Sequence, residues 1–173
     1  GGDRGFLLEN GVITDLGTLF GEAGHTTSFE INENGQIIGY SGILGETETH
    51  PFIWQDGVMR DLGDLPGVSG SADYARGINN LGEVVGMSGG RGFVWDDTLG
   101  MRDLNDLLDD SAVGWEITHP YDINDSGQIV GMGVNPDGNY RAFLLTPVPV
   151  LWAGLGVLGL VGAIRRKRVT ART

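Results

Sequence analysis

The feature that most constrains the fold is a segment of about 45 residues that occurs three times in this 173-residue chain. Each copy contains four short pieces in the same order: an apolar run led by Phe, a piece ending in Asp-Leu or Asp-Leu-Gly, a piece ending in Ile-Asn, and a piece that starts and ends with Gly. The Phe-led piece also occurs a fourth time. The pieces lie at 5–8, 51–54, 92–95 and 142–145, at 11–17, 57–63 and 100–105, at 31–32, 78–79 and 123–124, and at 35–39, 82–86 and 127–131.

The pieces have the composition of β-strands separated by turns. They are short, they contain many β-branched and aromatic residues, and Gly, Asn or Asp flanks them. The third and fourth pieces are joined by Asn-x-x-Gly, in which the Asn side chain can close a turn on its own backbone and Gly accepts a positive φ. We therefore predict three hairpin turns, which are formed by Asn32 and Gly35, Asn79 and Gly82, and Asn124 and Gly127.

A repeated unit of four strands and this length is typical of a β-propeller blade. A stacked β-solenoid is the alternative, and two hairpins per unit favour the propeller. We expect an all-β, propeller-like domain over 1–146 with units at about 5–40, 51–87 and 92–132 and a last strand at 141–146. Three blades are fewer than the roughly four to eight of a closed ring, so we also expect further sequence before the first residue.

Charge excludes one class of partner for this domain. All 23 acidic residues lie before position 165, whereas 5 of the 11 basic residues lie from position 165 onward. Such an acidic body repels phosphate backbones, so nucleic-acid binding is not expected. The chain has no Cys, which excludes disulfides and thiolate metal sites.

Several phrases resemble the HAF family of extracellular repeats, named for a His-Ala-Phe triplet. The resemblance covers residues 4–146 and rests on phrases at 50–54, 58–63 and 78–86. No unit carries the complete triplet: it is His-Pro-Phe at 50–52, Arg-Ala-Phe at 141–143 and Arg-Gly-Phe elsewhere. The resemblance implies an exported β-repeat protein and brings no activity with it.

The last part of the chain has a different composition. Residues 148–164 contain no charge, and a basic tail follows at 165–173. An apolar run of this length can span a bilayer as a short helix, and the positive-inside rule places the basic tail in the cytoplasm and the repeats outside. We therefore predict a transmembrane helix over 148–164; a buried core helix or a glycine-rich strand is the alternative.

Residues 147–173 resemble the PEP-CTERM sorting signal of Gram-negative bacteria, with Pro-Val-Pro in place of Pro-Glu-Pro. The resemblance implies processing by an exosortase-type enzyme, passage through the inner membrane, release to the cell surface or matrix, and an association with extracellular polysaccharide. The residues that carry it are Pro147, Pro149, Arg165, Arg166, Lys167 and Arg168.

Candidate sites for chemistry are few. The three His residues fall in different parts of their units, and no nucleophile or phosphate-binding motif is present, so we expect neither a catalytic site nor a cofactor. The recurring Asp of the second piece suggests a strand-end hydrogen bond repeated in each unit. One stretch matches the start of a calcium loop, with ligands at Asp122, Asn124 and Ser126, but it lacks the closing Glu.

These observations favour a non-enzymatic surface or matrix protein whose repeats bind a carbohydrate or protein partner. The alternative is a polysaccharide lyase or hydrolase with its site in the propeller channel. An enzyme would cluster His, Tyr, Glu or Asp near the axis, whereas a binding protein would vary its outer loops.

Overall fold

The computed structural model describes residues 2–68, 72–147 and 160–162, and its fold is all-β, as predicted. Three short 3-10 helices, η1 (Gly21–Ala23), η2 (Leu104–Leu107) and η3 (Asp110–Ala112), lie in the connections. The strands are β1 (Phe6–Glu9), β2 (Val12–Asp15), β3 (Gly24–Ile31), β4 (Ile37–Ile43), β5 (Thr49–Gln55), β6 (Val58–Asp61), β7 (Tyr74–Ile78), β8 (Val84–Ser88), β9 (Arg91–Asp96), β10 (Gly100–Asp103), β11 (Glu116–Ile123), β12 (Ile129–Val134), β13 (Tyr140–Pro147) and β14 (Leu160–Gly162).

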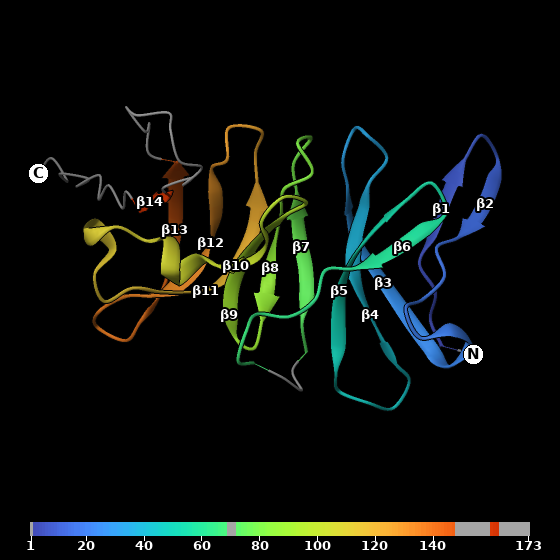
Figure 1. The fold of residues 1–173 in the computed structure, drawn as a ribbon, viewed down its shortest axis with the longest axis horizontal. Coiled ribbons are helices and arrows are strands. Elements are labelled where there is room, and N and C mark those ends of the chain that lie inside the picture. The colour runs from blue at the N-terminus through green and yellow to red at the C-terminus, as the bar shows by residue number, and fades with distance from the viewer. Residues whose placement is uncertain (1, 69–71, 148–159, 163–173) are drawn as a thin grey trace, which may run out of the picture.

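The strands form four antiparallel sheets that stand side by side along the molecule (Figure 1). The first contains β1 and β2, and each of the others contains four strands in chain order: β3 to β6, β7 to β10, and β11 to β14. The sheets of β3 to β6 and β7 to β10 therefore combine the last two pieces of one sequence unit with the first two pieces of the next, and in the last sheet β14 stands where a second piece would be. The sheets are offset by half a unit from the repeat as it is read from the Phe-led piece.

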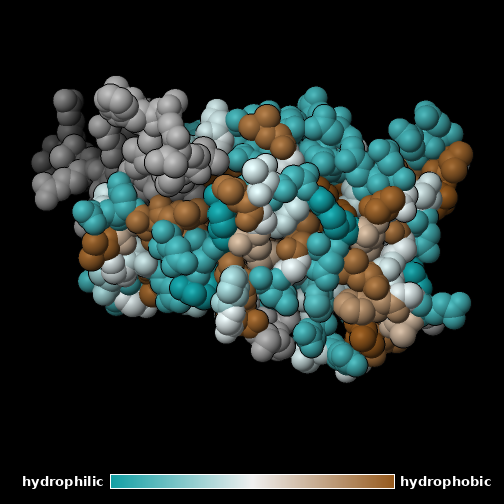
Figure 2. All heavy atoms as spheres, viewed as in Figure 1, coloured by the Kyte–Doolittle hydropathy of each residue, from teal (hydrophilic) through white to brown (hydrophobic). Residues whose placement is uncertain are grey.

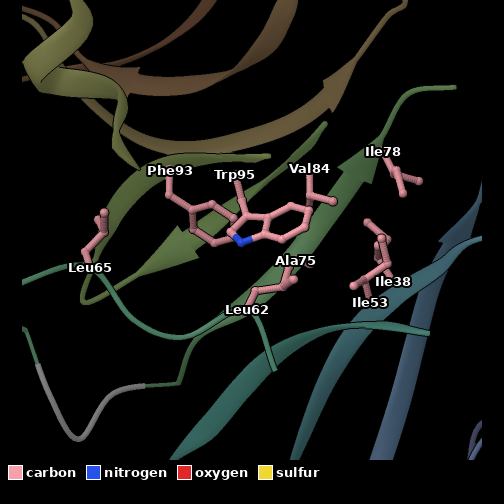
Figure 3. Packing of buried hydrophobic residues seen from close by; sticks show 9 residues of the cluster. All are labelled: Ile38, Ile53, Leu62, Leu65, Ala75, Ile78, Val84, Phe93 and Trp95. Carbon is pink, nitrogen blue, oxygen red and sulfur yellow. The ribbon is translucent and has the colours of Figure 1, made fainter. Parts of the chain in front are cut away.

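The sheets pack face to face because successive residues of their middle strands point to opposite faces. Ile37 belongs to the apolar cluster shared with the β1–β2 sheet, whereas Ile38 belongs to the cluster shared with the β7–β10 sheet. Val84 and Val85 divide in the same way between the two sides of their sheet. The cluster between the second and third sheets, drawn in Figure 3, consists of Ile38, Ile53, Leu62, Leu65, Ala75, Ile78, Val84, Phe93 and Trp95.

The first strands of the sheets lie next to one another. β7 contacts β3, β4 and β5 of the preceding sheet, and β11 contacts β7, β8 and β9. Each first strand carries a β-bulge, and the bulge brings a backbone carbonyl against a glycine of the second strand. A Cβ on Gly39, Gly86 or Gly131 would lie within about 2 Å of that oxygen, which explains the recurring Gly at the end of the fourth piece.

The two end sheets expose residues that are buried at the equivalent positions elsewhere. Phe6 and Leu8 of β1, which correspond to Phe52 and Trp54 of β5, are 61% and 60% exposed. Figure 2 shows apolar residues among polar ones at this end of the molecule. At the other end, Val130 and Leu144 are more than two-fifths exposed. Both outer faces thus have the apolar composition of the inner ones.

The expected transmembrane helix over 148–164 lies outside the described residues, except for 160–162. Those three residues form β14, which pairs with β13, so the helix prediction is wrong for them. The free edge of β13 offers unpaired backbone groups, and an extended segment satisfies them. Within the described part of the chain, no helix has the length and apolar character required to cross a membrane.

Candidate functional site

The three predicted Asn-x-x-Gly turns join the first and second strands of their sheets. In the first, the Oδ1 atom of Asn32 accepts hydrogen bonds from the N–H groups of Asn34 and Gln36, both at 3.0 Å. The N–H of Gly35 donates to the carbonyl of Asn32 at 3.1 Å, and Gly35 has a φ of 75°. Asn79 and Asn124 make the same two backbone contacts in their turns. The turn prediction is therefore confirmed at all three positions.

The turns are also hydrogen-bonded to one another, which the sequence did not predict. The Nδ2 group of Asn32 donates to the carbonyl of Asn79 at 2.9 Å, and Nδ2 of Asn79 donates to the carbonyl of Asn124 at 3.1 Å. A second row runs alongside, in which the N–H of Glu33 donates to Oδ1 of Asn80 and the N–H of Asn80 donates to Oδ1 of Asp125. We call these contacts the turn ladder. The turn ladder joins the turns of neighbouring sheets.

The recurring Asp of the second piece closes the end of the fourth strand. Asp15, Asp61 and Asp103 each accept a hydrogen bond at 2.8 Å from the N–H two residues later, which confirms the expected strand-end bond. The same Asp also pairs with the basic residue that precedes Phe: His50 lies 3.1 Å from Asp61, and Arg91 lies 2.8 Å from Asp103. The basic residue and the Asp of the motif therefore have an architectural role.

A cluster of aromatic side chains lies over the first strands, and we call it the aromatic patch: Phe29, Tyr40, Tyr74, Arg76 and Tyr121. The ring of Phe29 lies 5.7 Å from that of Tyr40 and 6.2 Å from that of Tyr74, and the guanidinium carbon of Arg76 lies 4.6 Å from its centroid. Phe29 and Tyr121 are 40% and 43% exposed. Burial raises the pKa of the Tyr74 hydroxyl, and the nearby Tyr121 raises it further.

Acidic groups border the aromatic patch on the side of the turns. A groove of about 280 Å³ crosses the three turns there, and Glu30, Glu33, Asp122 and Asp125 are among its lining residues. Partial burial raises the pKa of Glu30 above its usual value, Asp122 adds to the rise, and the N–H of Ile78, which donates to Oε2 at 3.0 Å, opposes it. The surface thus combines ring faces, one guanidinium group and several carboxylates.

The calcium candidates are engaged in the turn. Oδ1 of Asn124 already accepts two backbone hydrogen bonds, and Oδ1 of Asp122 accepts one from the N–H of Ile123. The N–H of Ser126 is one of the donors to Asn124, so this residue is part of the same turn. Over the described ranges, no three His, Asp or Glu side chains come close enough to hold a metal ion.

The structure covers one residue of the predicted sorting signal. Pro147 is the last residue of β13 and lies opposite Leu160. The other members lie outside the described residues: Pro149, Arg165, Arg166, Lys167 and Arg168.

Two parts of this arrangement were missed from the sequence. A fourth Asn-x-x-Gly turn joins β12 to β13: Asn135 Oδ1 accepts from the N–H of Asn139 at 2.8 Å, and Gly138 has a φ of 75°. The same four-residue spacing that identified the other turns would have found it. The aromatic patch gave a weaker signal: Phe29, Arg76 and Tyr121 each stand three residues before the Asn of their turn, but the residue type changes from unit to unit. Tyr40 and Tyr74 stand at other positions of the repeat, and the packing of the strands brings them to the same surface.

Comparison with protein families, with curated proteins and with solved structures found no match for this chain.

Proposed function

We propose that the chain is a non-enzymatic, exported repeat module that binds extracellular polysaccharide through the aromatic patch. The observation that supports this most directly is the row of partly exposed rings contributed by β3, β7 and β11, the first strands of three consecutive sheets. Aromatic groups gathered on an exposed surface are a mark of binding sites, because they bring a large contact area at a low cost in side-chain entropy.

The chemistry of the patch suits a sugar chain. The C–H faces of a pyranose ring can pack on Phe29 and Tyr121, while Arg76 donates hydrogen bonds and the carboxylates of the turn groove accept them from hydroxyl groups. The negative charge of the domain opposes anionic polymers, so a neutral polysaccharide fits better.

We further propose that the sheets are consecutive blades of a propeller-like arrangement. The contacts among β3, β7 and β11 support this, since the first strands of propeller blades line a common axis. The aromatic patch then lies near that axis, where a bound chain can touch several blades at once. The resemblances at 4–146 and 147–173 support export and sorting to the cell surface.

Affinity electrophoresis in gels that contain hydroxyethyl cellulose, xyloglucan or dextran tests the binding proposal. We expect at least one polymer to retard the protein, and we expect Phe29→Ala or Tyr121→Ala to weaken binding by about tenfold, the usual effect of losing one central aromatic contact. Leu99→Ala, which removes an exposed apolar side chain between β9 and β10 at the opposite edge of its sheet from β7, is the control. Equal retardation of all variants would refute the assignment of the patch.

The polysaccharide-acting enzyme remains the second candidate, because Glu30 has a raised pKa and lies near Asp122, as an acid and base pair would require. Release of reducing ends from the same polymers, abolished by Glu30→Gln and by Asp122→Asn, would favour that candidate over binding alone.

Sorting is tested by the intact mass of the protein recovered from its native host. We expect loss of about the last 25 residues, and retention of the full mass when Arg165, Arg166, Lys167 and Arg168 are changed to Ala. A full-length mass for both proteins would contradict processing.

A further inference from the structure

The third inter-sheet space has an aliphatic residue at the position where the first and second have a tryptophan. Two positions after the buried Phe of each third strand stand Trp54 in β5, Trp95 in β9 and Leu145 in β13. All three side chains are at least nine-tenths buried, and each faces the preceding sheet. The last sheet therefore places a short aliphatic side chain where its predecessors place an indole.

In the second space, the indole of Trp95 packs in the cluster that contains Ile53, Ile78 and Val84 (Figure 3). The guanidinium carbon of Arg60 lies 4.8 Å from the centroid of the Trp95 ring. This is the geometry of a cation–π contact. The surroundings of Trp95 thus include these three aliphatic side chains and one stacked guanidinium group.

In the third space, the residues at these four positions are Val94, Ile123, Ile129 and Arg102, and all four line a cavity of about 250 Å³. All four positions that contact the Trp95 ring in the second space therefore have counterparts in the wall of this cavity. Leu145 packs in one cluster with Val94, Ile123 and Ile129, so the larger ring of a Trp at position 145 would extend toward this cavity.

The polar groups around this cavity indicate what it can accept. The Nη2 group of Arg102 donates to Asp96, whereas Nε of Arg102 is buried without a hydrogen-bond partner in the described structure. Glu83 and Asp125 also line the cavity, and their carboxylates disfavour an anion and can accept a hydrogen bond.

We propose that this cavity, which we call the vacant-ring site, binds a neutral planar aromatic ring that carries an N–H or O–H donor. Its occupant is an indole or phenol, either free or on a tryptophan or tyrosine side chain. An aliphatic cavity of about 150 Å³ is large enough for benzene, and drug-sized ligands occupy about 300 Å³ or more, so the size suits one ring or two fused rings. This site is separate from the aromatic patch and does not depend on the proposed function.

Titration of the full chain with indole and with N-acetyltryptophanamide, followed by calorimetry, tests the proposal. We expect saturable binding at one site. We expect Leu145→Trp to weaken indole binding by at least tenfold and to raise the melting temperature without ligand, because the new side chain fills the cavity. Binding of indole alone would show that the site accepts free aromatic compounds only. Binding of both probes would show that it also accepts a tryptophan side chain.

Two further variants keep the test decisive if Leu145→Trp does not fold. Arg102→Met removes the stacked cation and retains the apolar wall, so it should weaken binding about threefold or more. Trp95→Leu creates the equivalent cavity under Arg60, so it should add a second indole site. Absence of indole binding by the unmodified chain, or unchanged affinity in Arg102→Met, would overturn the proposal.

Discussion

Replacement of Asn79 by Ala should destabilise the fold more than the same replacement of Asn124. Both side chains accept hydrogen bonds from two backbone N–H groups of their own turn. Asn79 is 3% exposed and also donates to the carbonyl of Asn124 in the next sheet. The Nδ2 group of Asn124 donates to Gln128 of its own turn, and the residue is exposed. The pair of variants therefore separates the contribution of the turn from that of the turn ladder.

The expected loss of unfolding free energy depends on which backbone groups each variant leaves without a hydrogen-bond partner. In Asn124→Ala, water can solvate the freed N–H groups, so the loss is about 1 kcal/mol. In Asn79→Ala, the partly buried N–H groups and the carbonyl of Asn124 lose partners. Each buried group costs about 1 to 3 kcal/mol when it is left unsatisfied, so we expect a total of about 3 kcal/mol. The expected difference between the variants is about 2 kcal/mol.

Urea denaturation of the two variants and the unmodified chain, followed by far-UV circular dichroism, measures this difference. The slopes of the transitions should agree, because the same surface is exposed on unfolding. Free energies of unfolding that agree within about 0.5 kcal/mol for Asn79→Ala and Asn124→Ala would refute the role given to the turn ladder.

Two further predictions concern the backbone and pH. Gly86→Ala should cost about 3 kcal/mol or more in unfolding free energy, because the new Cβ would lie 2.1 Å from a backbone oxygen. Gly90→Ala should cost about 1 kcal/mol, because Gly90 has a φ of 79° but no atom lies within 4 Å of the new Cβ. Equal urea midpoints for the two variants would contradict this prediction. Burial raises the pKa of Glu30 above 4.5 and that of Asp64 above 3.8. The folded state then binds more protons than the unfolded state above about pH 4, so stability should fall as pH rises. Glu30→Gln and Asp64→Asn should each reduce that fall, and a melting-temperature profile unchanged by both would refute the assignment.

The sequence predicted the strands, the three turns and their residues because each of these features depends on contacts within a few residues. The hydrogen bonds that close the turn of Asn32 and Gly35 join residues no more than four positions apart. The assignment of strands to sheets depends on longer contacts: the sequence groups the piece at 5–8 with the one at 35–39, whereas the structure pairs β5 with β4. A repeat has no intrinsic starting point, so aligning the units with one another could not show where one sheet ends and the next begins.

The candidate sites were less predictable for a related reason. Phe29 and Tyr121 stand at the repeat position that Arg76 occupies in the middle unit, three residues before the turn Asn, whereas Tyr74 stands at another position. The change of residue type obscures this recurrence, and the packing of β3, β7 and β11 brings the three rings together. The vacant-ring site was present in the sequence as a single departure from the repeat, Leu145 in the place of Trp. The sequence could not show that this substitution leaves a cavity, because one wall of the cavity is Arg102, which belongs to the neighbouring sheet.

The turn ladder also gives the array a direction. Every rung is donated by the earlier unit and accepted by the later one, so the two ends of the array are chemically different: one offers the Asn32 carbonyl, and the other offers the Asn124 amide. The exposed apolar faces differ in the same sense, with Phe6 at one end and Val130 at the other. Units of this kind can therefore extend one another head to tail, as monomers add to a polar filament, whereas two arrays that meet through identical ends cannot continue the ladder.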